Sequence, residues 1–104
     1  MANPWAGEVS IEIDGVPHCC KLTLGALAAL EAGLAAGSLV ELVRRFEGGA
    51  FSSSDVMAVV VAGLRGGGWQ GTSADLMTAE IAGGPIDAAK VAAQLLARAF
   101  EAPE

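Results

Sequence analysis

Apolar and polar positions alternate strictly at the start of the chain. Every second residue of EVSIEI, residues 8–13, is apolar, which is the period expected of a strand with one face in water. Asp14-Gly15 follows, and this dipeptide favours a tight hairpin turn. The chain then runs back through VPHCCKL, where an early Pro17 is typical of an edge strand. The pattern predicts a β-hairpin over about residues 8–22.

Over about residues 24–101 the apolar spacing changes to that of helices separated by glycines. A good N-cap residue precedes each of four apolar runs, and an acidic residue three positions later often completes a capping box. These predicted N-caps are Thr23, Ser38, Ser52 and Thr72. The sequence therefore predicts a mainly α protein with an N-terminal β-hairpin, a small α+β fold with four to five short helices joined by glycine-rich turns. We expect a single domain spanning residues 1–104.

The predicted helices differ in which faces are apolar. Residues 56–64 carry no charge, and although three consecutive valines leave a strand open, the capping signals and alanines favour a helix. A helix that is apolar all round is either central to the core or keeps a second face for a partner. The first helix is expected to run to Gly37, on a stripe of Leu24, Leu27, Leu30 and Leu34. The glycine-rich residues 63–71, which we call the glycine cluster, come next. A helix with Leu76, Met77 and Ile81 follows them and should end at Gly83-Gly84. The last helix opens at Pro85, and its inward residues are predicted to be Ile86, Ala89, Ala93, Leu96 and Phe100.

The charge balance argues against several classes of partner. Twelve acidic and six basic side chains give a net charge of −6, whereas nucleic acids and anionic membranes attract clustered cations. No apolar run has the length of a membrane span, and the first residues lack the apolar core of a signal peptide. Two adjacent cysteines make no disulfide framework. We expect a cytoplasmic protein that binds neither nucleic acid nor membrane.

The stretch GLRGGGWQG, residues 63–71, invites comparison with a phosphate-binding loop. Such a loop needs a preceding strand and a helix N-terminus directly after the glycines, but here the preceding segment is expected to be helical. The interpretation that fits better is a joint between helices. In it Gly66 takes the left-handed conformation at a helix end, and Trp69 fixes the loop to the core.

Residues for chemistry are scarce elsewhere. His18-Cys19-Cys20 offers the only metal or redox ligands, and two ligands on one strand face do not close a zinc site. With one histidine, no tyrosine and no serine in a nucleophile elbow, the sequence predicts no enzyme, no metal and no cofactor. The cysteines are expected to be small, half-buried strand residues.

The ordered series of motifs NPWAGEV, KLTLGALAALE, SLVELVRRFE, FSSSDV and GLRGGGW carries a resemblance. From about Asn3 to Phe100 the chain resembles the small protein encoded just before the tape measure in alphaproteobacterial gene transfer agents, which are phage-like particles with a siphophage-type tail. That family is described as tail assembly chaperones and also as tail tube proteins.

The resemblance implies a function without catalysis. The expectation is a tail assembly chaperone that binds the tape measure protein in the cytoplasm, recruits tail tube protein and is absent from the finished particle. The alternative is a structural tube component, which we disfavour because tube proteins of this type usually carry larger β-sheets. The sequence leaves open whether the chain forms a homo-oligomer.

A chaperone for apolar helices needs an exposed apolar groove. Methionine adapts to varied partners and tryptophan anchors interfaces, which favours the uncharged helix and the residues of these types near it. Trp5 lies apart, before the hairpin, where a tryptophan must either fold back onto the domain or contact a partner. The candidate partner-binding residues are Trp5, Met57, Val60, Leu64, Trp69 and Met77. The alternative is that they fill the core, since apolar residues at helical spacing are usually buried.

Overall fold

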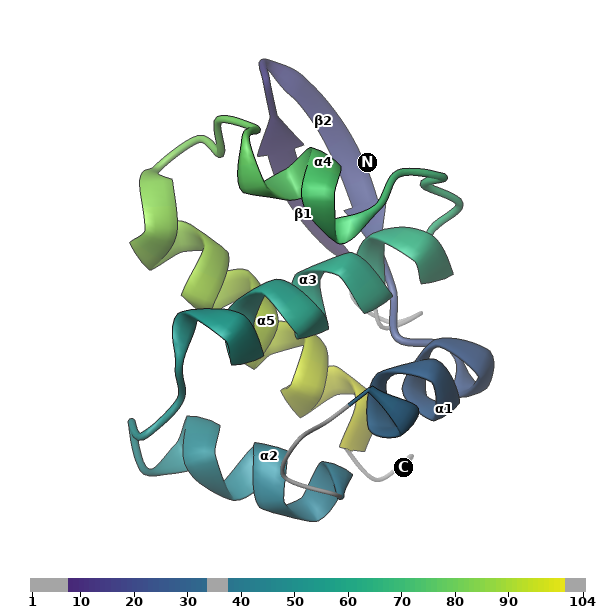
Figure 1. Cartoon of the computed structure of the whole chain (residues 1–104), viewed down its shortest axis with the longest axis vertical. Coiled ribbons are helices and arrows are strands. Elements are labelled where there is room, and N and C mark those ends of the chain that lie inside the picture. Colours follow the sequence, from purple (N-terminus) through teal and green to yellow (C-terminus); the bar gives the residue numbers. More distant parts are fainter. Residues whose placement is uncertain (1–7, 34–37, 101–104) are drawn as a thin grey trace.

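A two-stranded hairpin precedes five helices in the part of the chain that the computed structural model describes, residues 8–33 and 38–100 (Figure 1). The hairpin consists of β1 (Val9–Ile13) and β2 (Val16–Cys20), paired antiparallel. The helices are α1 (Leu24–Ala32), α2 (Leu39–Glu47), α3 (Ser53–Gly66), α4 (Ser73–Met77) and α5 (Gly84–Phe100). The predicted fold class, a small α+β protein with an N-terminal hairpin, is confirmed.

The hairpin forms as its sequence predicts. The apolar residues of β1 are buried while Ser10 and Glu12 between them are exposed. Asp14 and Gly15 have φ angles of 51° and 81°, and two positive values in succession are what a type I′ turn requires. This turn fixes the register in which Ile13 lies opposite Val16.

α3 is the central helix, and it lies across α5 in the middle of the molecule (Figure 1). It also contacts α1, α4 and β2. Its residues 59–64 are all buried, so the uncharged helix forms the core rather than a surface. A full capping box begins it, with Ser52 accepting from the Asp55 backbone N–H and the Asp55 carboxylate accepting from that of Ser52.

The glycine cluster joins α3 to the hairpin by close backbone contact. A Cβ on Gly66 would overlap the carbonyl oxygen of Lys21, and one on Gly67 would overlap that of Cys19. The predicted left-handed conformation of Gly66 is wrong, because α3 continues through this residue and Gly68 takes the positive φ, 105°. Glycines are needed here mainly for the approach of two backbones.

α1 is shorter than expected. Thr23 caps it as predicted, accepting a hydrogen bond from the Ala26 backbone N–H at 3.1 Å. It ends at Ala32 with Gly33 as its C-cap, whose backbone N–H donates to the carbonyls of Ala29 and Leu30. The predicted end at Gly37 is therefore wrong. Leu24 is 85% exposed, and Leu34 lies outside the described residues.

The helix expected after the glycine cluster is also shorter. α4 ends at Met77, and the chain then runs extended along the outer edge of β1, where Ile81 forms a bridge with Ile13. The backbone carbonyl of Glu80 accepts from the Asp14 backbone N–H at 2.7 Å, and the Ala82 backbone N–H donates to the Glu12 backbone carbonyl at 3.1 Å. These bonds to β1 take the place of helical bonds.

α5 buries a different face from the one predicted. Only Leu96 of the five predicted inward residues is buried, while Ile86 and Phe100 are 70% and 49% exposed. The sequence also predicts that a charged stripe of Asp87, Lys90, Gln94, Arg98 and Glu101 faces solvent, and its described members lie largely on the surface. An alanine-rich helix has apolar residues on both sides of such a stripe. The face that contacts α3 and β1 consists of Ala88, Val91, Ala92, Leu95 and Leu96.

Candidate protein-binding site

An exposed apolar face follows α5 from end to end. Ile86, Ala93 and Phe100 recur at intervals of nearly two turns and so lie on one line along the helix. Ala89 and Ala97 lie one turn to either side of Ala93 and complete the stripe. We call these five residues the α5 face.

Three adjoining hollows run beside the α5 face. The first, of about 360 Å³, lies between α3 and the start of α5 and is almost wholly apolar. Phe51, Pro85 and Ala89 line both this hollow and the second, while Phe46 and Ala93 line both the second and the third. The third ends at Phe100. The first hollow therefore lies against α3, and the other two lie between α5 and residues 43–51, which we call the α2 segment. We call the three adjoining hollows together the groove.

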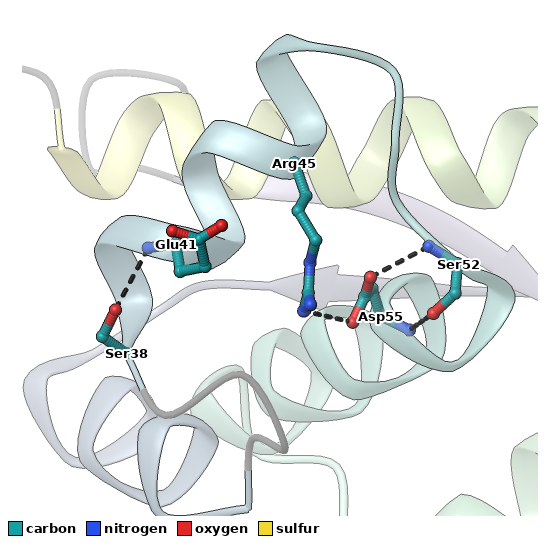
Figure 2. A network of polar contacts seen from close by, with 5 residues as sticks. All are labelled: Ser38, Glu41, Arg45, Ser52 and Asp55. Carbon is teal, nitrogen blue, oxygen red and sulfur yellow. Dashed lines mark hydrogen bonds and ion pairs between the residues drawn. The ribbon is translucent and has the colours of Figure 1, made fainter.

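The wall of this groove is held in place by an ion pair and an aromatic stack. The Arg45 guanidinium of α2 donates to the Asp55 carboxylate of α3 at 2.8 Å, and the other oxygen of that carboxylate accepts from the Ser52 backbone N–H at 2.9 Å (Figure 2). Phe46 and Phe51 stack nearly parallel, with ring centroids 4.7 Å apart. These contacts therefore join α2 to the start of α3.

The structure does not bring the predicted partner-binding residues together. Met57 and Val60 line the first hollow, and Val60 is nearly inaccessible at 1% exposure. Leu64 is fully buried, as the core interpretation expects. Trp69 lines another hollow, beside the hairpin, and Met77 is 70% exposed on α4. Trp5 lies outside the described residues.

Sequence reasoning missed most of the groove. Phe46, Phe51, Ile86 and Phe100 line it, and none of them is among the predicted partner-binding residues. Ile86 and Phe100 had been assigned to the interior, since they lie away from the charged stripe of α5. The available signal was that α5 has more apolar positions than one buried face can hold.

The motifs examined for chemistry have structural roles. Arg65 donates to the carbonyl oxygen of Gly71 from two nitrogens, at 3.3 and 3.2 Å, and so closes the glycine loop. Burial raises the pKa of the Cys20 thiol to about 12, and burial together with nearby Glu8 raises the pKa of Cys19. Both thiols are therefore poor nucleophiles at neutral pH. Within residues 8–33 and 38–100 no group of His, Cys, Asp and Glu side chains is arranged to hold a metal ion.

Comparison with known families assigns the chain. Residues 6–102 match a family model described as phage tail tube protein, GTA-gp10. The chain belongs to this phage tail tube family. No curated protein and no solved structure matches the chain significantly.

Membership of the tail tube family overturns the expected function. The family is one of tube proteins, so the prediction of an assembly chaperone that binds the tape measure protein is wrong. That prediction discounted a tube component because the chain has one small hairpin. Fold class is a weak guide to function, because helical surfaces bind other subunits as well as sheets do. The gene transfer agent and phage tail assignment itself is confirmed.

The exposed edges of a hairpin decide whether it can join the sheet of a neighbouring molecule. The 80–82 segment covers the outer edge of β1, and the end of α3 covers the Cys19–Lys21 part of β2, where Lys21 donates to the Gly63 carbonyl at 2.8 Å. Pro17 has no N–H to offer on the remaining edge. This hairpin is therefore poorly suited to joining a neighbour's sheet.

The tail tube family points to other tail proteins as partners. None of the described helices is long and apolar enough to cross a membrane. With the hairpin edges covered, the groove beside α5 is the apolar surface of the described residues that we consider for such a partner.

Proposed function

We propose that this protein is a structural component of the tail tube of a gene transfer agent particle. It contributes by binding other tail proteins and performs no catalysis. The observation that carries the proposal is the match to the tail tube family across residues 6–102.

The physical character of the surface supports this proposal. Large apolar faces on small domains usually mark sites of protein association. The α5 face and the Phe46–Phe51 wall form such a surface, and the thiols with raised pKa values offer no reactive centre. A protein of this kind works through shape and apolar burial.

Its proposed partners are further copies of the same chain and neighbouring tail proteins, the tape measure protein among them. We propose that synthesis and the first contacts take place in the cytoplasm, before incorporation into the particle.

Quantitative mass spectrometry of purified particles tests the proposal. A tube component should be present in many copies per particle, in constant ratio to the other tail proteins. Cross-linking of the same particles would show which neighbours it touches. Particles that contain no copies, or only traces, while retaining complete tails would refute a structural role.

A further inference from the structure

We propose that the α5 face is a homodimer interface, on which α5 of a second copy packs antiparallel about a two-fold axis at Ala93. The choice of a second copy as occupant rests on the proposed function, in which many copies of the chain meet. The pairing geometry rests on the structure alone.

The first argument is the symmetry of the α5 face. Ile86 and Phe100 lie equally far from Ala93 along the helix, so an antiparallel copy centred there places Ile86 beside the partner's Phe100 at both ends. The middle of the stripe carries only the methyl groups of Ala89, Ala93 and Ala97. Small residues let two helices approach closely, and the bulky residues then cover each other's flanks. Such a surface is self-complementary, as a two-fold contact requires.

The second argument is the scarcity of charge. The five residues of the α5 face are all apolar, and the charged side chains that line the hollows beside them are Lys90 and Glu47. In the antiparallel pair each Lys90 comes opposite the region of the partner's Ala97, so the two lysines are offset along the axis. Antiparallel helices also align their dipoles favourably.

The third argument is size. α5 has 17 residues and is therefore about 25 Å long. With the α2 segment beside it, at the usual helix spacing of about 10 Å, the face measures roughly 25 by 20 Å. An area of this order lies at the lower end of specific interfaces, where association is weak and depends on concentration. We therefore expect a dimer that dissociates in the micromolar range.

A two-fold contact closes after two copies. The dimer is thus a unit that exists before or within assembly, and growth of a tube needs a different contact. This pairing shields the exposed Ile86 and Phe100 from water while the protein is free.

Sedimentation equilibrium of the full chain over a range of concentrations is the first test. The wild type should pass from monomer to dimer, and Ile86→Glu should weaken dimerisation at least tenfold. Leu24→Glu is the matched control, because Leu24 is also highly exposed but lies on α1, and it should leave dimerisation unchanged. Circular dichroism confirms that each variant is folded. A folded wild type that stays monomeric at every concentration, or equal effects of the two variants, would overturn the inference.

Cysteine cross-linking tests the symmetry, in a Cys19→Ser background that leaves the buried Cys20 in place. Ala93→Cys should form a disulfide dimer by itself, since residue 93 meets its own copy. Ile86→Cys and Phe100→Cys should cross-link when mixed and not separately. Self-cross-linking of Ile86→Cys would instead show a parallel pairing and refute the proposed arrangement.

The dimer and the tube proposal can fail separately. A monomeric protein that is abundant in particles would contradict only the dimer, whereas a dimer that is absent from particles would contradict only the tube component.

Discussion

Replacing Gly63 by alanine tests how closely α3 packs against α5. Gly63 is buried in the middle of the core, and an added Cβ would lie 2.6 Å from Leu95 Cδ1 and 3.3 Å from Cys20 Cβ. Overpacking of this kind costs about 1–3 kcal/mol. Alanine also favours the helix over glycine by about 1 kcal/mol. We therefore expect Gly63→Ala to destabilise the fold by about 0–2 kcal/mol, the difference of these two effects.

The second substitution, Leu95→Ala, removes the group that the new methyl would strike. Leu95 is 1% exposed, and truncating a buried leucine costs about 2–5 kcal/mol. In the double variant the methyl on residue 63 occupies part of the vacated space, so the overpacking cost disappears. The double variant should be more stable than the sum of the two single effects predicts, by about 1–3 kcal/mol.

Urea denaturation followed by circular dichroism measures these free energies of unfolding for the wild type, both single variants and the double variant. Gly25→Ala is the matched control. Gly25 also lies in a helix, α1, but the nearest atom to a Cβ added there is Thr23 Oγ1, at 4.0 Å. It should stabilise the protein by about 0.5–1 kcal/mol through helix propensity. Additivity of Gly63→Ala and Leu95→Ala within about 0.5 kcal/mol would refute the direct contact between them.

Three further predictions concern other contacts of the fold. Gly66→Ala should cost more than Gly63→Ala, at least about 3 kcal/mol, because its Cβ meets the backbone of Lys21 and no side chain can move aside; an equal or smaller cost in the same urea experiment would contradict this. Asp55→Ala should destabilise by about 1–3 kcal/mol, because it removes both the ion pair and the bond from the Ser52 backbone N–H that completes the capping box. Arg45→Met loses only the ion pair and should cost under about 1 kcal/mol; equal midpoints in thermal melts would show that the Asp55 half of the capping box contributes nothing. In the folded protein the Cys20 thiol has a pKa of about 12, against 9.0 ordinarily, so between these pH values the folded state binds more protons than the unfolded state. The free energy of unfolding should therefore fall as pH rises from 9 towards 12, and urea titrations across that range should show a smaller fall for Cys20→Ala.

Local signals in the sequence were enough to predict the hairpin, the N-caps and the central helix. Each depends on residues close together in the chain, such as Asp14-Gly15 or Ser52 with Asp55. The end of α1 at Gly33 and the short α4 were missed. α4 is short because the 80–82 segment forms hydrogen bonds with β1, which is far away in sequence. A local sequence pattern cannot predict such a distant partner.

The binding face could not be read from the sequence for a related reason. In α5 the alanines make several faces almost equally apolar, so periodicity identifies the charged stripe and leaves the buried side undetermined. The buried side of α5 is determined by the packing of α3 and β1, which cover Val91 and Leu95 and leave Ile86 and Phe100 exposed. The missing information was tertiary.

The contact of Gly66 and Gly67 with β2 has a mechanical consequence. At this junction main chain rests on main chain, with no layer of side chains between them that could change rotamer and yield under load. The hairpin and the end of α3 should therefore move together as one stiff body. Under bending or tension, deformation would then occur elsewhere than at this junction.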